Sequence, residues 1–222
     1  MYIDKKEVLR YLGHKNQIIQ EQLNLLIDQC IEEVKQYTKP KYTFGVFDIK
    51  KNDEGVELLE SNLIFKGKDI KEHLKNSDMC AVMAVTLGSL VDSKIRYYEK
   101  FNLTKAVIWD SCASVLIEKI CDEAECEIRK IAKNIDLGIT YRYSPGYGDF
   151  PIDIQEKILN TLQAQKNIGL TATENSILIP RKSVTAVIGF QDKSITSEHP
   201  GCTVCSNYET CEYRRGGDYC VN

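Results

Sequence analysis

The sequence predicts an α+β fold in which helices flank a mixed, largely antiparallel and twisted sheet. Three observations lead to this prediction. Long segments carry apolar residues at helical spacing, short apolar runs have the composition of buried strands, and the two kinds of element do not alternate regularly. Regular alternation of strands and helices would have favoured a parallel sheet instead.

The first half of the chain opens with helices and continues with strands. The apolar stripe expected on the longer helix consists of Ile19, Leu23, Leu26, Cys30, Val34 and Tyr37. Lys39-Pro40 ends that helix, because a residue before proline disfavours helical backbone angles. A turn at 52–55, with the sequence Asn-Asp-Glu-Gly, separates two strands. The expected elements of this half are helices at 5–12, 15–37 and 69–76, and strands at 42–49, 56–59, 63–65 and 79–87.

The second half combines two consecutive helices with further strands. The apolar face of the second helix is expected to consist of Val107, Ala113, Ile117, Ile120, Ala124, Ile128 and Ile131. The expected elements are helices at 89–101, 104–132 and 152–164, and strands at 137–141, 176–178 and 183–190.

Size and composition restrict the class of protein. A chain of 222 residues buries a proper core and is expected to form one domain with small appendages. A formal net charge of −3 argues against a nucleic-acid partner, because nucleic-acid binders usually present a basic face. No apolar run reaches the ~18 residues of a membrane span, and the first residues lack the apolar core of a signal peptide. We therefore expect a cytoplasmic protein with no membrane partner.

The segment from Arg142 to Tyr147, Arg-Tyr-Ser-Pro-Gly-Tyr, carries the clearest chemical signal. Pro145 and Gly146 suit the two central positions of a type II turn, since the second of these requires a positive φ. Arg142 can hold a carboxylate through two parallel hydrogen bonds. The segment is thus typical of a site for a small zwitterion with an aromatic or heterocyclic group. From spacing alone, a surface arginine beside an ordinary turn is the commoner explanation of such a segment.

The chain has nine cysteines, and they fall into two groups. Five are scattered through apolar patterns and are expected to be buried structural thiols, namely Cys30, Cys80, Cys112, Cys121 and Cys126. Four lie close together at the C-terminus, namely Cys202, Cys205, Cys211 and Cys220. Four thiolates are the ligand set of a structural zinc ion and also of an iron–sulfur cluster. Reduced thiols without metal are the alternative. The three histidines show no ligand spacing and are expected at the surface.

With these motifs in view, the chain resembles the activation domain of cobalamin-dependent methionine synthase. That family has the fingerprint Arg-Pro-x-Pro-Gly-Tyr-Pro, followed by a helix, an Ile-Gly-hydrophobic-Thr segment and a Pro-x-x-Ser-Val strand. The corresponding residues here are Arg142–Tyr147, Ile168–Thr171 and Pro180–Ala186, and the detailed match is confined to this part of the chain. The resemblance implies an activation-like domain at 1–200, with an N-terminal part at 1–100, a ligand-binding part at 101–200, and a cysteine-rich tail at 201–222.

The resemblance also implies which residues bind a ligand. In the family this turn binds S-adenosylmethionine, and the role carries over to Arg142, Ser144, Gly146 and Tyr147. Tyr143 and Gly148 stand where the family has proline, and we expect both to loosen the turn. A helical acid of the family corresponds to Glu118, aligned through Arg129. Asp122 follows Glu118 one turn later on the same face, and a solvated helix face is the alternative explanation for both acids.

The function implied by the resemblance is repair of methionine synthase, and so a role in methionine biosynthesis. The chain would be a stand-alone accessory subunit that supports reductive methylation of cob(II)alamin on a separate corrinoid protein, which supplies the cobalamin. An electron donor such as flavodoxin or ferredoxin would be a second partner. Two alternatives stay open: an iron–sulfur electron-transfer activator of another corrinoid methyltransferase, and a non-catalytic S-adenosylmethionine-binding protein.

Overall fold

The computed structural model describes residues 1–14, 17–61, 63–195 and 209. These residues fall into two compact units. The first comprises Met1–Lys39 and Leu87–Lys119, and the second comprises Pro40–Thr86 and Ile120–Glu198, of which residues up to 195 are described. The predicted domain boundaries at residues 100 and 200 stay predictions.

The first unit is helical. Its elements are α1 (Lys5–Tyr11), α2 (Glu21–Tyr37), α4 (Ser89–Phe101) and the first part of α5 (Leu103–Asn134). Two side chains cap these helices at their N-termini. The amide of Lys6 donates to Asp4 Oδ1 over 2.8 Å, and the amide of Lys105 donates to Asn102 Oδ1 over 3.0 Å. Capping bonds of this kind satisfy amides that have no partner within the helix.

The apolar stripe predicted for α2 was correct at Cys30 and Val34, which are fully buried, and wrong at its N-terminal end. The buried residues of this helix are Ile27, Cys30, Ile31 and Val34, whereas Leu23 is exposed. The helix also begins at Glu21, later than predicted. On α5, Val107 and Ile131 are exposed, and the other five residues of the predicted face are buried. Leucines and isoleucines occur on several sides of both helices, so tertiary packing selects the stripe that is buried.

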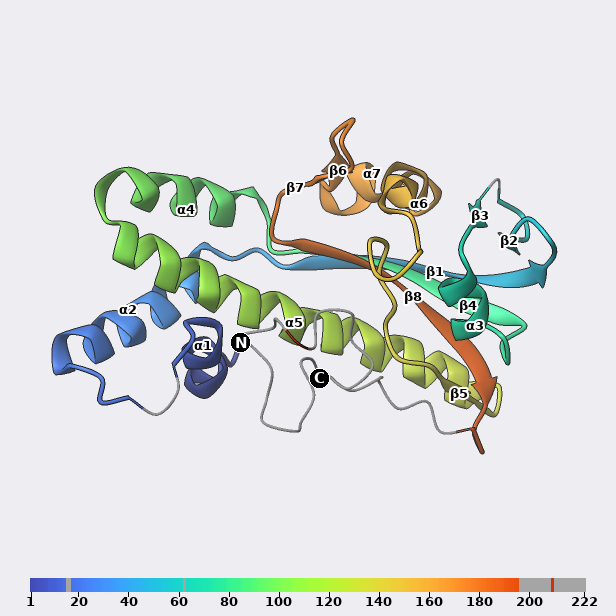
Figure 1. Cartoon of the computed structure of the whole chain (residues 1–222), viewed down its shortest axis with the longest axis horizontal. Helices are drawn as coiled ribbons and strands as arrows, with labels where there is room; N and C mark the ends of the chain where they lie inside the picture. The colour runs from blue at the N-terminus through green and yellow to red at the C-terminus, as the bar shows by residue number, and fades with distance from the viewer. Residues whose placement is uncertain (15–16, 62, 196–208, 210–222) are drawn as a thin grey trace. The chain divides into compact units, whose positions relative to one another are not determined.

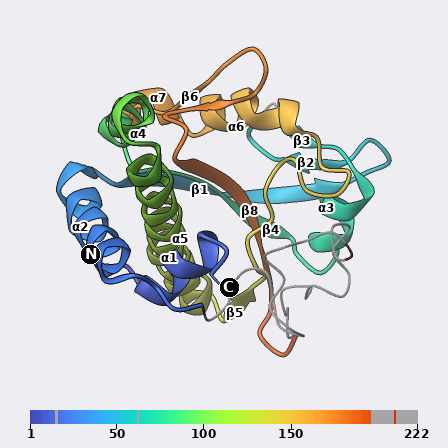
Figure 2. The same ribbon diagram turned by 60° about the vertical axis from the view of Figure 1, so that its left-hand side comes forward.

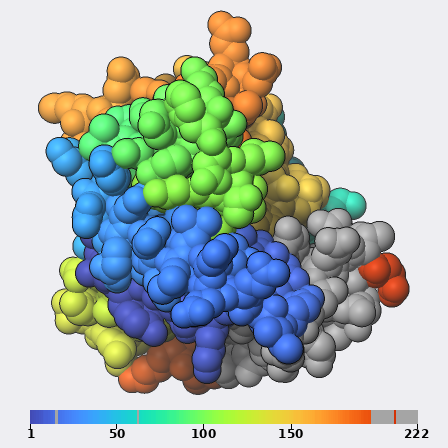
Figure 3. All heavy atoms as spheres, turned by 90° about the vertical axis from the view of Figure 1, so that its left-hand side faces the viewer, coloured from blue at the N-terminus to red at the C-terminus, as the bar shows by residue number. Residues whose placement is uncertain are grey.

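A polar cluster joins three helices of the first unit. Glu33 accepts hydrogen bonds from the Tyr98 hydroxyl at 2.8 Å and from Lys105 Nζ at 2.7 Å. Burial would raise the pKa of the Glu33 carboxyl, but these bonds outweigh it and lower the pKa. The outer side of α4 and the first turns of α5 are at the surface, as the green spheres of Figure 3 show. The exposed apolar side chains there are Leu90, Tyr97, Phe101, Leu103 and Val107.

The second unit contains a six-stranded sheet. Its strands are β1 (Lys41–Lys51), β2 (Val56–Leu58), β3 (Ile64–Phe65), β4 (Met79–Thr86), β5 (Leu137–Ile139) and β8 (Ser183–Asp192), in the order β3-β2-β1-β4-β8-β5. Every pairing between them is antiparallel. Strands β4 and β8 each pair with a strand on both sides and are almost entirely buried, which explains their nearly continuous apolar sequences. A separate two-stranded sheet pairs β6 (Thr171–Ala172) with β7 (Leu178–Ile179).

Short helices cover one face of this sheet. They are α3 (Lys68–His73), the 3₁₀ turn η1 (Ile152–Ile154), α6 (Gln155–Thr161) and α7 (Ala164–Ile168), and Figure 1 shows where they lie. The helix predicted at 152–164 is helical from Ile152 to Thr161, as η1 and α6, and ends earlier than predicted, because Gln163 takes a left-handed conformation with φ 48° and separates α6 from α7. Ile70, Phe150, Ile158 and Val187 belong to the hydrophobic cluster on this face.

The part of α5 that belongs to the second unit lies on the other side of β8 from α3 (Figure 2). Its buried residues include Cys121, Ala124 and Ile128. Helices therefore flank an antiparallel sheet, and the predicted α+β class is confirmed. Among the described residues, no helix is both long enough and apolar enough to span a membrane.

Candidate functional site

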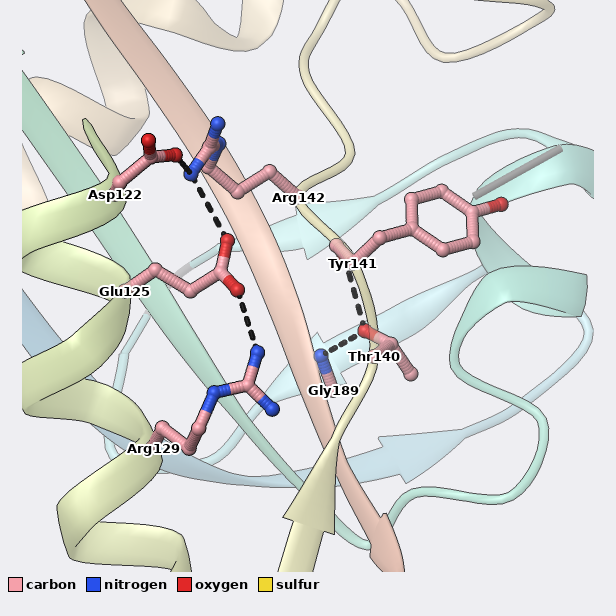
Figure 4. A network of polar contacts seen from close by, with 7 residues as sticks. All are labelled: Asp122, Glu125, Arg129, Thr140, Tyr141, Arg142 and Gly189. Atoms are coloured by element: carbon pink, nitrogen blue, oxygen red, sulfur yellow. Dashed lines mark hydrogen bonds and ion pairs between the residues drawn. The ribbon is translucent and has the colours of Figure 1, made fainter. Parts of the chain in front are cut away.

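The chain that follows β5 continues along β8 and so gives Arg142 its direction. The Thr140 amide donates to the Gly189 carbonyl over 2.9 Å, and the amides of Tyr143 and Val187 each donate to the other residue's carbonyl over 2.9 Å. Side chains of an extended segment alternate between the two faces. Arg142 therefore points towards α5, whereas Tyr141 points to the opposite side, as Figure 4 shows.

A type II turn follows, as the sequence predicted. The Tyr147 amide donates to the Ser144 carbonyl over 3.3 Å, and Gly146, at the third position, has φ 93°. Pro145 is buried, while Gly146 is exposed and Tyr147 is 63% exposed. The turn thus anchors its proline in the protein and presents the glycine backbone and an aromatic ring to the outside.

Two more backbone bonds close the segment into a compact loop, here called the 142–150 loop. The Phe150 amide donates to the Tyr147 carbonyl over 3.0 Å, and the Gly146 amide donates to the Phe150 carbonyl over 2.8 Å. Phe150 is buried and contacts Phe65 with a ring-centroid distance of 5.4 Å. The loop is therefore fixed to the core at its far end.

The expectation that Tyr143 and Gly148 loosen the turn was wrong. The Tyr143 hydroxyl donates to the Tyr147 carbonyl over 3.2 Å, and its ring stacks between His73 and Phe150, at centroid distances of 5.1 and 6.1 Å. Gly148 adopts φ 53°, and a side chain there would collide with the Asp69 carboxylate and the Tyr143 hydroxyl. Tyr143 therefore holds the turn through its hydroxyl and ring, and Gly148 leaves the space that the Asp69 carboxylate occupies.

Arg142 is part of an ion-pair network with α5. Its Nη1 atom lies 3.0 Å from Asp122 Oδ1 and 2.9 Å from Glu125 Oε2, and its side chain is only 12% exposed. Glu125 also pairs with Arg129, at 2.7 Å (Figure 4). Among the described residues, this network combines two arginines with two carboxylates. A ligand carboxylate at Arg142 would consequently share the guanidinium with Asp122 and Glu125.

The other predicted binding residue, Glu118, lies on the part of α5 that belongs to the first unit. Its side chain is half-buried, and after burial its charge is the largest cause of the raised pKa of Tyr11. Asp122 follows it after four residues of the same helix, as predicted. Asp122 and Glu125 of α5 contact Arg142, and the role predicted for Glu118 at a ligand stays a prediction.

The four predicted metal ligands Cys202, Cys205, Cys211 and Cys220 lie outside the described residues. Within the described part of the chain, no group of three or more histidine, cysteine or acidic side chains is arranged to hold a metal ion. The remaining cysteines are buried as predicted, with the exception of Cys126, which is exposed on α5. Burial raises the pKa of Cys80 to about 12, so this thiol stays protonated.

Sequence reasoning missed three residues around the loop. His73, expected at the surface, is half-buried and lies 3.0 Å from the Thr140 hydroxyl through its Nε2 atom. Asp69 and Asp149 bond to each other's backbone. These contacts join positions 67 to 80 residues apart in the chain, and no local pattern of the sequence indicates them.

No family of known sequences matches the chain, and no curated protein matches it either. Its fold is similar to that of a solved structure, the crystal structure of the MetH reactivation domain bound to AdoHcy, with a TM-score of 0.63. The similarity covers 88% of this chain and 72% of that chain, at 15% sequence identity. The two chains share a fold.

Proposed function

We propose that the chain binds S-adenosylmethionine at the 142–150 loop and acts as a stand-alone reactivation domain for a separate cobalamin-dependent methionine synthase. One observation carries the proposal. The segment that resembles the family's binding motif forms the expected type II turn, in a fold similar to that of the MetH reactivation domain bound to AdoHcy. AdoHcy is what S-adenosylmethionine becomes once its methyl group has been transferred, so the neighbour's ligand belongs to the proposed chemistry.

Each residue of the loop has a role that its geometry supports. Arg142 would hold the ligand carboxylate, since a guanidinium can serve several carboxylates from its different edges. Ser144 and the exposed Gly146 would offer backbone groups, because no side chain at Gly146 blocks a close approach. Tyr147, with its exposed ring, would cover the adenosyl group.

The ligand's ammonium group requires an acid close to Arg142. In an amino acid, the ammonium and the carboxylate are attached to the same carbon, so their protein partners must lie within a few ångströms of each other. Asp122 meets this requirement through its 3.0 Å contact with Arg142, and its side chain is 47% exposed. Glu118 is the acid that the family resemblance implies. We propose Asp122 for the ammonium and keep Glu118 for the ribose hydroxyls.

The proposed reaction takes place on the partner. The methyl group leaves the sulfonium of S-adenosylmethionine and passes to the partner's cob(II)alamin together with one electron from an external donor, such as flavodoxin or ferredoxin, and S-adenosylhomocysteine is released. The sulfonium is reactive by itself, so this chain contributes binding and orientation rather than acid–base catalysis. A cluster at the C-terminal cysteines would be an alternative source of the electron.

Calorimetry with S-adenosylmethionine tests the binding step. Arg142→Ala should weaken binding by ~2 kcal/mol or more, because a charged hydrogen bond is lost. Arg129→Ala is the matched control, since Arg129 pairs with the same Glu125 and is also an arginine of this network. An affinity that falls equally in both variants would argue against a direct role for Arg142.

A reactivation assay tests the function itself. The chain is added to a methionine synthase that lacks its own activation domain and holds cob(II)alamin, in the presence of S-adenosylmethionine and a reductant. Methylation of the corrinoid that depends on this chain supports the proposal. Tight binding without methylation would leave a non-catalytic S-adenosylmethionine-binding protein, and absence of binding would remove both functions.

A further inference from the structure

Two aspartates that are 80 residues apart bind each other's backbone. Asp149 accepts hydrogen bonds from the amides of Lys68, at 2.7 Å, and Asp69, at 2.9 Å, one on each carboxylate oxygen. In return, Asp69 Oδ2 accepts a hydrogen bond from the Asp149 amide at 3.0 Å. These three bonds, here called the aspartate clamp, connect the 142–150 loop to the first turn of α3.

Two glycines make the clamp possible. A side chain at Gly148 would collide with the Asp69 carboxylate, and one at Gly67 would lie 2.7 Å from Asp149 Oδ1 and 2.8 Å from the Asp149 carbonyl oxygen. Both glycines have positive φ values, 53° and 122°, which side chains disfavour. The backbone at Gly148 therefore leaves space for the Asp69 carboxylate, and the backbone at Gly67 leaves space for Asp149.

The clamp fixes the conformation of the loop and contributes little to the stability of the core. Asp69 and Asp149 are both exposed, so burial of their side chains contributes little to stability. α3 itself is anchored, because Ile70 and Leu74 are fully buried in the hydrophobic cluster. Hydrogen bonds from the Asp69 and Lys68 amides hold the pKa of Asp149 below its usual range, so the carboxylate is charged at neutral pH.

Several attachments hold the ligand-facing turn from within this chain. The strand pairing with β8 fixes Tyr143, the ion pairs with α5 hold Arg142, and the clamp fixes the residues directly after Tyr147. The Tyr143 hydroxyl and the buried Phe150 also hold the loop, and the clamp connects residue 149, two positions after Tyr147, to α3. A loop that is already ordered loses less conformational entropy when a ligand binds.

We propose that Asp69 and Asp149 are positioning residues, which hold the 142–150 loop in its ligand-binding conformation without any partner protein. The inference rests on the proposed function and extends it: the S-adenosylmethionine site is formed in the isolated chain, and its affinity depends on two residues that do not touch the ligand.

The experiment combines calorimetry with amide hydrogen exchange on the full chain alone. The variants are Asp149→Ala and Asp69→Ala. The control is Asp4→Ala, which removes a carboxylate that likewise accepts a hydrogen bond from an amide in the first turn of a helix, in the first unit. The amides of Tyr147 and Phe150 are the informative ones, because they bond within the loop and not to either aspartate.

We expect the unaltered chain to bind S-adenosylmethionine with no corrinoid protein present. Both clamp variants should bind at least about tenfold more weakly and lose exchange protection at the Tyr147 and Phe150 amides. Asp4→Ala should keep its affinity within about twofold while its thermal stability falls. Unchanged affinity in the clamp variants, or an equal loss in all three, would overturn the positioning role.

Failure of the proposed function gives a different result. If the unaltered chain does not bind S-adenosylmethionine, amide hydrogen exchange still shows whether the clamp orders the loop. Protected Tyr147 and Phe150 amides that become unprotected in Asp149→Ala would then support a preformed loop for another ligand. Amides that are unprotected already in the unaltered chain would contradict the preformed loop itself.

Discussion

The phenol hydroxyl of Tyr143 donates a hydrogen bond to the backbone carbonyl of Tyr147, with 3.2 Å between the two oxygens. This bond spans the type II turn and joins the strand-paired part of the loop to the exposed part. Burial, followed by the nearby charge of Asp69, raises the pKa of Tyr143 to about 12. The hydroxyl therefore remains a donor at neutral pH.

Stability should depend on pH through this phenol. The pKa of Tyr143 is raised in the folded protein, from 10.0 to about 12, so the phenolate is favoured in the unfolded chain. The resulting stabilisation is complete below pH 10 and is lost as the pH rises towards 12. Tyr143→Phe should lower the unfolding free energy by about 1 kcal/mol at neutral pH, through loss of the hydrogen bond.

Urea unfolding across this pH range checks the prediction. The difference in unfolding free energy between the unaltered chain and Tyr143→Phe should shrink above pH 10, because only the unaltered chain loses the contribution of this phenol. Other tyrosines are common to both proteins, so their titration cancels in the difference. A difference in unfolding free energy that stays constant with pH would contradict a raised pKa of Tyr143 in the folded protein.

The acids of α5 should differ in their effect on ligand binding. Asp122→Asn removes the negative charge that we propose for the ligand's ammonium, so we expect S-adenosylmethionine to bind about tenfold more weakly. Glu118→Gln should weaken binding less, through loss of hydrogen bonds to hydroxyl groups. Calorimetry on both variants provides the comparison. If Glu118→Gln lost more affinity than Asp122→Asn, Glu118 would be the partner of the ligand's ammonium, as the family resemblance implies.

Gly148 should be far less tolerant of a side chain than other glycines with positive φ. Gly148→Ala places a methyl group against the Asp69 carboxylate and the Tyr143 hydroxyl, so we expect loss of both stability and ligand affinity. Gly169→Ala is the matched control, because Gly169 has φ 71° and no atom within 4 Å of the added carbon. It should cost about 1 kcal/mol of stability and no affinity.

Thermal unfolding of the two glycine variants measures the loss of stability, and calorimetry with S-adenosylmethionine measures the loss of affinity. Equal affinities in both variants would show that the contact with Asp69 does not matter for binding.

Metal analysis addresses the cysteine-rich tail. If Cys202, Cys205, Cys211 and Cys220 bind one centre, anaerobically purified protein should contain about one zinc ion, or about four iron and four sulfide ions, per chain. Cys205→Ser should remove most of the bound metal. Cys126→Ser is the control and should keep the metal, since Cys126 is an exposed cysteine on α5. Protein with none of these elements would exclude the centre.

Local features were predictable from the sequence. Pro145 and Gly146 determine the type II turn, because the turn depends on the backbone angles of those two residues alone. The buried strands β4 and β8 followed from their apolar runs. The boundaries of α4 were predicted as observed, whereas α2 begins six residues later than the predicted residue 15. The break at Gln163 was not predictable, since nothing in its residue type requires the left-handed conformation that separates α6 from α7.

The side-chain contacts around the turn depended on tertiary structure. The sequence by itself determined that Arg142 stands beside a turn suited to a zwitterion. Only the folded chain decided that Asp122 and Glu125 share this arginine, and that Asp69 holds Asp149. An ion pair or a hydrogen bond requires atoms within about 4 Å, and for residues 20 or 80 positions apart this proximity is set by the packing of helices against the sheet.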